Sequence, residues 1–325
     1  FRVVERYPTL CRRSEIGRSR AGRPIWALSV SARPGARRAL PTVLVLPALD
    51  VESVSGARLT LDLAARLAAA QDGWEGRSHL SSAELLFVPA PDPDAWFPRA
   101  GSLTRRLDRN FPVRWDPWLA DGSSPGPYPL SEPESRALAD LVLGRPEIGA
   151  AVLLTGARRG RLARALERRD PGSFAAFLDG ACGMPVLVGA ERVVAGSLRG
   201  DRPDAWSFSR AAVAQLPRLV AEPGRLERLA GGLWQFDVDV RNVGGAATTP
   251  GPLVRLGGGV SLRIEGARLA RLGRAARADG ASFELVDVPA RSPRLPPLDA
   301  GEGVHLRLWL RANEGDRAVV EFSTP

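Results

Sequence analysis

Short apolar runs alternate with amphipathic stretches over the first two thirds of the chain. The runs at residues 42–46 (T-V-L-V-L) and 148–154 (I-G-A-A-V-L-L) are almost continuously apolar, as in strands buried on both faces. Apolar side chains then recur at helical spacing, and the alternation predicts an α/β domain whose sheet is covered on both sides. We expect strands at 25–30, 42–46, 84–89, 148–154 and 186–188 and helices at 54–69 and 131–143, the latter with Ser131 as N-cap and Glu134 completing a capping box.

The pattern changes near residue 223. From residue 232 onward, apolar and polar residues alternate with a period of two, as in L-W-Q-F-D-V-D-V and V-H-L-R-L-W-L, between turns rich in Gly and Pro. Helical patterning remains only at 267–278. We therefore predict an α/β domain at 1–221, a linker at 222–231 and a small all-β, immunoglobulin-like sandwich at 232–325.

Composition excludes two classes of function. The formal net charge is +9, but every basic residue is arginine and the arginines are spread along the chain, without the basic stripe and interleaved aromatics of a nucleic-acid footprint. No apolar run approaches the length of about 20 residues that a membrane-spanning helix needs. The sequence therefore predicts neither nucleic-acid binding nor a membrane span.

Cysteine and histidine are scarce. Cys11 and Cys182 lie far apart and have no metal-ligand spacing, so we expect two buried small side chains, with one long-range disulfide as the alternative. The two histidines, His79 and His305, lie in different segments and both fit solvent-facing positions. Since zinc needs several converging His, Cys or carboxylate ligands, they cannot supply an ordinary zinc site.

Five short motifs occur in a recognisable order. They are E-I-G-R-S-R-A-G-R-P-I after Y-P-T-L, L-P-A-L-D-V-E-S-V-S-G, V-P-A-P-D-P-D, L-D-R-N-F-P, and G-P-Y-P-L-S-E-P-E-S-R-A-L. Together they resemble the zinc carboxypeptidase family, the relatives of carboxypeptidases A and B, over about residues 5–200. The all-β tail resembles sandwiches appended to some bacterial members. The resemblance implies a mixed-sheet α/β fold and favours a periplasmic or secreted protein.

The same resemblance implies where catalytic groups should stand. The family holds zinc with a His and a Glu from one short motif and with a later His. Those three positions fall on Asp50, Ser53 and Thr155; a register shifted by one places Leu49 and Glu52 on the first two. No imidazole is restored in either register.

The substrate-binding positions are altered too. The family's Asn-Arg pair becomes Asp108 and Arg109, and Arg105 stands for the arginine that polarises the scissile carbonyl. We expect Asp108 to pair with Arg109 and to repel a terminal carboxylate. Glu222 is the one nearby candidate for the general base, and the substrate-contacting Tyr has no counterpart.

These losses predict a catalytically inactive carboxypeptidase-like protein, without metal or other cofactor, that binds a peptide or protein partner or serves in assembly. One alternative is an active metallocarboxypeptidase or other hydrolase, with Asp50, Glu52 and Asp108 holding a calcium or magnesium ion, or with Ser53 or Ser55 as nucleophile. The other is a purely structural subunit. Tryptophans fit either a binding rim or a lid over the core: Trp96, Trp115, Trp118 and Trp206.

Overall fold

The structure is a computed structural model of the chain. It describes residues 2–32, 40–47, 49, 53–70, 80–81, 83–96, 106–113, 115–119, 123–145, 147–154, 174–178, 186–188, 210, 212–245, 260–275, 284–286, 294–295, 298, 301–313 and 317–323.

The chain divides into two compact units, Phe1–Leu216 and Pro217–Pro325. The expected linker at 222–231 is wrong, because a ten-residue strand, β7 (Leu219–Arg228), occupies most of it and pairs with the following strand. Its P-G-R sequence reads as a loop, but in the structure it forms an irregularity within the strand.

The N-terminal unit is built on a six-stranded mixed sheet in the order β1-β2-β4-β3-β5-β6. The first two strands are antiparallel neighbours, and β3, β4, β5 and β6 run parallel to one another. All residues of the central strands β3 and β5 are buried, which explains their continuous apolar sequences. The bounds are β1 Cys11–Arg18, β2 Pro24–Val30, β3 Thr42–Pro47, β4 Glu84–Phe87, β5 Ile148–Leu154 and β6 Val186–Val188.

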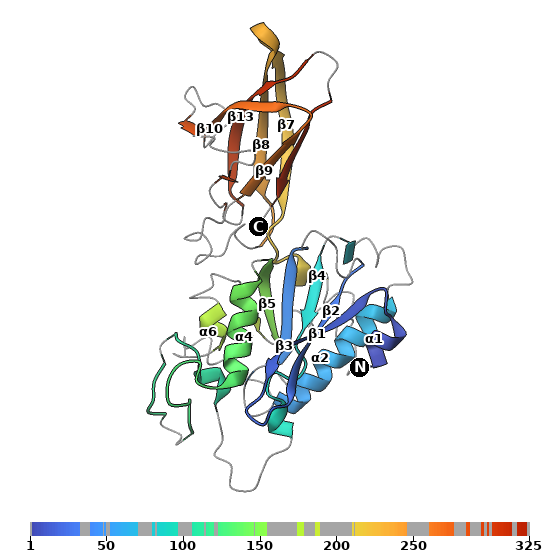
Figure 1. Cartoon of the computed structure of the whole chain (residues 1–325), viewed down its shortest axis with the longest axis vertical. Coiled ribbons are helices and arrows are strands. Elements are labelled where there is room, and N and C mark those ends of the chain that lie inside the picture. The colour runs from blue at the N-terminus through green and yellow to red at the C-terminus, as the bar shows by residue number, and fades with distance from the viewer. Residues whose placement is uncertain are drawn as a thin grey trace. The chain divides into compact units, whose positions relative to one another are not determined.

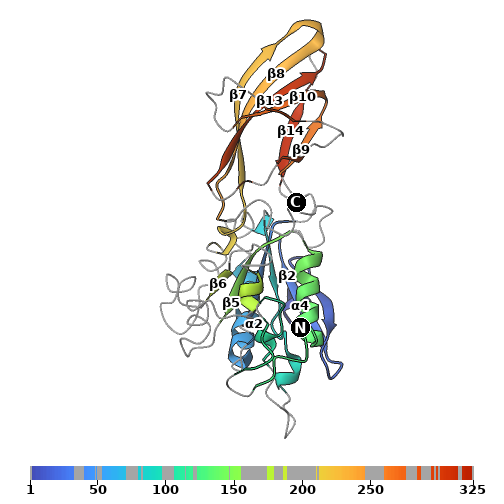
Figure 2. The same cartoon turned by 90° about the vertical axis from the view of Figure 1, so that its left-hand side faces the viewer.

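Two helices cover opposite faces of this sheet (Figure 2). Helix α2 (Ser53–Ala69) packs on one face with the alternate strand residues Val43 and Val45. Helix α4 (Pro133–Gly144) packs on the other face with Leu44 and Leu46. The predicted α/β layer order is thereby confirmed, and so are the expected strands and helices to within a few residues at their ends.

Short helical segments complete the unit (Figure 1). Phe111, Phe174 and Phe177 stack together beneath α4, with the closest ring centroids 4.6 Å apart, and fix the segment after η3 to the core. The helices are α1 Arg2–Arg6, η2 Pro93–Trp96, η3 Leu107–Arg109 and α6 Phe174–Ala176. None of the described helices is long and apolar enough to cross a membrane.

The C-terminal unit contains two antiparallel sheets, β11-β10-β13-β8-β7 and β12-β9-β14, whose inward apolar side chains share one core. The strands beyond β7 are β8 Leu233–Asn242, β9 Val260–Glu265, β10 Arg268–Ala275, β11 Glu284–Val286, β12 Arg294–Leu295, β13 Gly303–Arg311 and β14 Val319–Ser323, with the 3-10 turn η5 Ala230–Gly232 before β8. The period-two pattern is therefore explained by alternate burial, as in β13.

The helix that the sequence pattern suggests at 267–278 is not formed. Residues Arg268–Ala275 form strand β10, which pairs with β13 on one side and with β11 on the other. Ala, Leu and Arg favour helices intrinsically, but two hydrogen-bonded neighbours and the burial of Leu272 outweigh a preference of a few tenths of a kcal/mol per residue.

Candidate functional site

The carboxyl ends of β3 and β5 define one edge of the sheet in the N-terminal unit. Pro47 and Leu154 are register partners there, and α2 begins six residues after Pro47. Gly56 lies in the first turns of α2, where an added Cβ would come within 2.8 Å of the Pro47 side chain and 3.0 Å of the Leu154 carbonyl oxygen. Only glycine permits the helix to approach both strand ends so closely.

This edge is where the sequence places the three metal-ligand positions. Ser53 is the first residue of α2, and the structure describes only its backbone. Asp50, Thr155 and Arg105 lie outside the described residues. Since the chain leaves β3 at Pro47 and β5 at Leu154, the segments that carry Asp50 and Thr155 start from adjacent points of one sheet edge. The topology thus brings together segments more than 100 residues apart in sequence.

The altered pair Asp108–Arg109 lies in the 3-10 helix η3. The Asp108 carboxylate is 8% exposed and accepts two hydrogen bonds of 2.8 Å from Nε and Nη2 of Arg106. Arg109 Nε lies 3.5 Å from the same carboxylate, so it is an ion-pair partner at longer range. Sequence reasoning expects Asp108 to pair with Arg109 and overlooks Arg106, whose bidentate geometry makes it the stronger partner.

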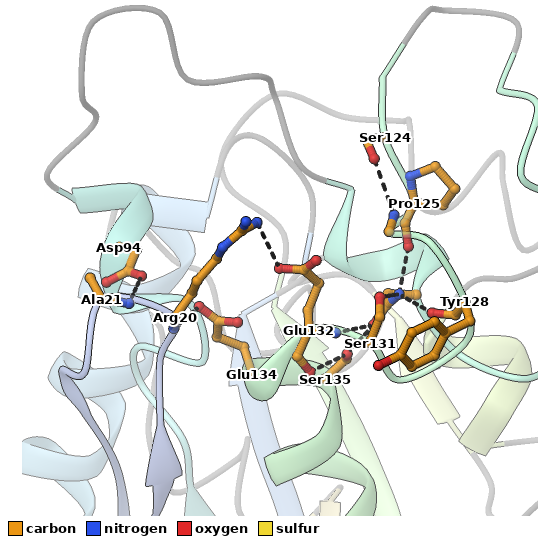
Figure 3. A network of polar contacts seen from close by, with 12 residues as sticks. Arg20, Ala21, Asp94, Ser124, Pro125, Tyr128, Ser131, Glu132, Glu134 and Ser135 are labelled. Carbon is orange, nitrogen blue, oxygen red and sulfur yellow. Dashed lines mark hydrogen bonds and ion pairs between the residues drawn. The ribbon is translucent and has the colours of Figure 1, made fainter.

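Asn110, directly after η3, is completely buried and is the centre of a polar network, whose members Pro125, Tyr128, Ser131, Glu132 and Ser135 are labelled in Figure 3. Its Nδ2 carries two hydrogens, which are shared among three acceptors: the carbonyl oxygens of Pro125 and Tyr128 and Ser131 Oγ, at 2.5, 3.0 and 2.9 Å. Its Oδ1 accepts from the Glu132 amide at 3.0 Å and from the Ser135 hydroxyl. Every donor and acceptor of the amide is thereby used, which ties η3 to the start of α4.

The predicted capping box at the start of α4 is wrong. The helix begins at Pro133, its N-cap is Glu132, and no side chain caps it. The Ser131 hydroxyl accepts from Asn110, and the Glu134 carboxylate, which is completely buried, accepts from the Arg20 amide at 3.0 Å. Both groups are engaged by distant segments, so the local motif is used for tertiary contacts.

A second carboxylate, Asp94 in η2, holds the turn between β1 and β2. It accepts hydrogen bonds from Ser19 Oγ at 2.8 Å, the Ala21 amide at 2.9 Å and Arg23 Nη1 at 2.6 Å (the bond to Ala21 is drawn in Figure 3). Burial alone would raise the pKa of Asp94, but these hydrogen bonds and the Arg23 charge lower it below its ordinary value. The motif V-P-A-P-D-P-D therefore has a scaffold role here.

The titratable groups suited to metal binding or nucleophilic attack are scattered. The expectation that His305 faces solvent is wrong, because it is 7% exposed and its Nδ1 lies 2.8 Å from Asp239 in the C-terminal unit. His79 lies outside the described residues. Among the described residues, no three His, Cys, Asp or Glu side chains gather as a metal site.

The cysteine expectation is confirmed for one residue. Cys11 is buried, pairs with no other cysteine in the described part of the chain, and has a thiol pKa that burial raises to about 11. Such a thiol is almost entirely protonated at neutral pH and is a poor nucleophile. Cys182 lies outside the described residues.

The class of protein follows from these features together. The mixed sheet with helices on both faces agrees with the mixed-sheet α/β fold that the family resemblance implies. Residues 2–159 match the family model described as zinc carboxypeptidase. This N-terminal region belongs to the zinc carboxypeptidase family.

Solved structures give more distant similarities. Carboxypeptidase A from Helicoverpa armigera shares 16% identity and a TM-score of 0.45 over 65% of this chain and 67% of its own. Thrombin activatable fibrinolysis inhibitor shares 19% identity and a TM-score of 0.42 over 64% of this chain and 60% of its own. An aspartoacylase family protein from Mesorhizobium loti shares 13% identity and a TM-score of 0.37 over 97% of this chain and 95% of its own. The comparison with curated proteins gave no match.

Proposed function

We propose that this chain is a catalytically inactive member of its family and that it acts by binding a peptide or protein partner. One observation carries the loss of catalysis. The chain has two histidines, and one of them, His305, is buried against Asp239 in the C-terminal unit. His79 is then the only imidazole in Phe1–Leu216, whereas the zinc site that the family resemblance implies needs two.

The donor set at the expected ligand positions does not fit zinc either. Asp50, Ser53 and Thr155 would offer one carboxylate and two hydroxyls. Zinc sites in proteins use imidazole, thiolate or carboxylate, and neutral hydroxyls are poor ligands for it. The shifted register places Glu52 at the second position but Leu49 at the first, so it also offers a single carboxylate, with one hydroxyl from Thr155. We therefore assign no reaction step to a metal ion.

The candidate general base lies in a strand of the C-terminal unit. Glu222 is an exposed residue of β7, a strand that pairs along its length with β8 inside the C-terminal unit. It belongs to a different compact unit from the sheet edge at Pro47 and Leu154. As a paired strand residue of the C-terminal unit, Glu222 has a structural setting of its own, and we assign it no role in activating water.

The carboxylate-binding position argues in the same direction. Asp108 supplies a buried carboxylate to Arg106 and lies 3.5 Å from Arg109. A substrate's terminal carboxylate would have to approach this negative charge, and two carboxylates in a partly buried site repel each other by several kcal/mol at an effective dielectric constant of about 20. The chain's own carboxylate thus takes the role that a substrate carboxylate has in the family.

Exposed aromatic side chains support a binding role. Trp118 is 85% exposed and Tyr128 is 56% exposed, and the Tyr128 carbonyl is bonded to Asn110, next to Arg109. Rigid, exposed aromatic residues commonly anchor protein and peptide interfaces.

For the C-terminal unit, we propose that its two packed antiparallel sheets form an immunoglobulin-like sandwich.

Selection of binding peptides from a random library on the full chain tests this function. Enriched peptides should bind the native protein, remain intact by mass spectrometry, and lose at least about tenfold in affinity with Trp118→Ala or Tyr128→Ala. Leu143→Ala is the matched control, because Leu143 is an apolar residue of α4 that is 52% exposed. Shortening of the peptides from the carboxyl end would contradict the proposal.

A further inference from the structure

The C-terminal unit has an apolar cavity of about 430 Å³ between its two sheets. Its walls come from β7, β8 and β13 on one side and from β14 and the β9–β10 turn on the other. Among the lining residues, Asn313 has the only polar side chain. The large apolar residues of the lining are Leu226, Trp234, Phe236, Leu310, Val320 and Phe322.

This cavity lies at the margin of the core. Trp234, Phe236, Val320 and Phe322 pack against the buried cluster but are only partly buried themselves. Leu226, on the same wall, is 61% exposed. Apolar side chains that point inward but remain in contact with water favour a further apolar layer over them.

The two sheets differ in width, which explains the exposure. The larger sheet has five strands and ends at β7, whereas the smaller has three strands and ends at β14 (Figure 2). In the described part of the chain, β14 pairs only with β9, and β7 pairs only with β8. One more strand beside β14 would face β7 and would cover Leu226 from the inside.

The two edges are not equally open to pairing. β7 contains Pro223 and Gly224, and its register with β8 is interrupted between Pro223 and Leu226. Proline and bulges at an edge hinder the addition of another strand. β14 is V-V-E-F-S, with neither Pro nor Gly and with a continuous register to β9. The backbone of β14 is therefore the available template.

We propose that the C-terminal unit binds an extended peptide, which adds to the edge of β14 that pairs with no strand among the described residues and places alternate apolar side chains in this cavity. Main-chain hydrogen bonds supply affinity in such strand addition, and the pocket selects the side chains. The proposal concerns another unit of the chain than the exposed aromatic residues of the N-terminal unit and stands independently of them.

Cavity size and strand geometry define the peptide. A cavity of roughly 150 Å³ accepts one benzene-sized group, so about 430 Å³ accepts two or three apolar side chains. Alternate residues of a strand lie about 6.8 Å apart on one face. The five residues of β14, of which Val320 and Phe322 line the cavity, match a segment of five residues with two or three inward apolar side chains.

The outward positions of the peptide should be polar or basic. The side chains of Val319 and Glu321 alternate with those of Val320 and Phe322, so Glu321 is the charged group beside the added strand. Opposite charges on neighbouring strands stabilise a pair, and like charges destabilise it. An acidic residue opposite Glu321 is therefore disfavoured.

The probe is a fluorescein-labelled synthetic heptapeptide in which leucine or valine alternates with threonine or arginine, added to the full chain. Its anisotropy should report binding at least about tenfold tighter than that of a peptide of the same composition with all apolar residues adjacent. Two N-methylated peptides complete the test, one methylated at the odd-numbered residues and one at the even-numbered residues. Only one of them should lose binding, because only one loses the N–H donors that face β14.

Variants that fill the cavity, with one matched control, locate the site. Ala221→Phe fills the cavity and should weaken peptide binding at least about tenfold. Glu222→Phe places the same ring on the next residue of β7, outside the cavity lining, and should change affinity by less than about twofold. Ala318→Leu, on the opposite wall, repeats the test if Ala221→Phe lowers the thermal unfolding midpoint.

Four results would overturn the proposal: no binding of the alternating peptide, equal binding of both compositions, no effect of N-methylation in either phase, or insensitivity to both cavity-filling variants. A cavity that takes anilinonaphthalene sulfonate but not the peptide would be a small-molecule site. A dimer by size exclusion that Ala221→Phe dissociates would show that a second copy is the occupant. Either of these two findings also replaces the proposal.

Discussion

Asp108 and Asn110 lie two positions apart in the motif L-D-R-N-F-P and differ in what they contribute to the protein. Asn110 is completely buried, and its amide joins five partners in the segment from Pro125 to Ser135. Asp108 has an ion pair with Arg106 and departs from the asparagine that the family resemblance implies. Asn110 builds the scaffold, and we propose that Asp108 closes a binding position.

This contrast teaches that scaffold and chemistry are separable within one motif. The network around Asn110, Glu134 and Asp94 positions loops, and it functions whether or not catalytic groups are present. Its motifs therefore identify the family while saying nothing of catalysis. Three predictions test the contrast, beginning with the largest expected effect.

Replacing Asn110 should destabilise the N-terminal unit most. Asn110→Ala leaves several buried donors and acceptors without a partner, and we expect a loss of about 3–5 kcal/mol in the free energy of unfolding. Asn110→Asp keeps the shape but loses the donated bonds, and should cost at least as much. Urea denaturation followed by circular dichroism measures both. A loss below about 1 kcal/mol would remove the distinction between scaffold and site.

Removing Asp108 should have a smaller effect on stability and no gain in activity. Asp108→Ala leaves the partly buried Arg106 guanidinium without its bidentate partner. We expect the free energy of unfolding to fall by about 2–3 kcal/mol. Because the pair acts as one unit, Arg106→Ala and the double variant should show a coupling energy of at least about 1 kcal/mol. Additive losses from the two single variants would show that the ion pair is not the stabilising contact.

Asp94 should give the smallest effect and a pH dependence. Asp94→Asn should lower the free energy of unfolding by about 1–2 kcal/mol at neutral pH. Because the folded pKa of Asp94 is lowered, its contribution is complete above the ordinary carboxyl pKa of about 4 and is lost as pH falls through the lowered folded value. The stability difference between native protein and variant should therefore shrink below about pH 4. A difference that stays constant down to pH 2 would show that the charge of Asp94 is not involved.

The sequence predicts what depends on local pattern. Continuous apolar runs identify β3 and β5, and helical spacing identifies α2 and α4, because burial on one or two faces fixes the period. The strand β10 escapes this reasoning, since its composition favours a helix and its pairing with β13 is a long-range contact.

The site is predictable only in part. The motif order locates Asp108 and Arg109, but Arg106 is noticed only once the turn of η3 brings its guanidinium onto Asp108. Ser131 and Glu134 match a local capping pattern, yet Asn110 and Arg20 bind them, and no local rule could foresee that. His305 appears solvent-facing from strand alternation, whereas the structure buries it against Asp239.

The central claim is the loss of zinc-dependent hydrolysis, and one measurement tests it most directly. The purified full chain is analysed for metal by elemental mass spectrometry, and the same sample is assayed for carboxypeptidase activity with added zinc and with a chelator. We expect substoichiometric zinc and no turnover, since Phe1–Leu216 contains one histidine. One zinc ion per chain together with chelator-sensitive release of carboxyl-terminal residues would contradict it.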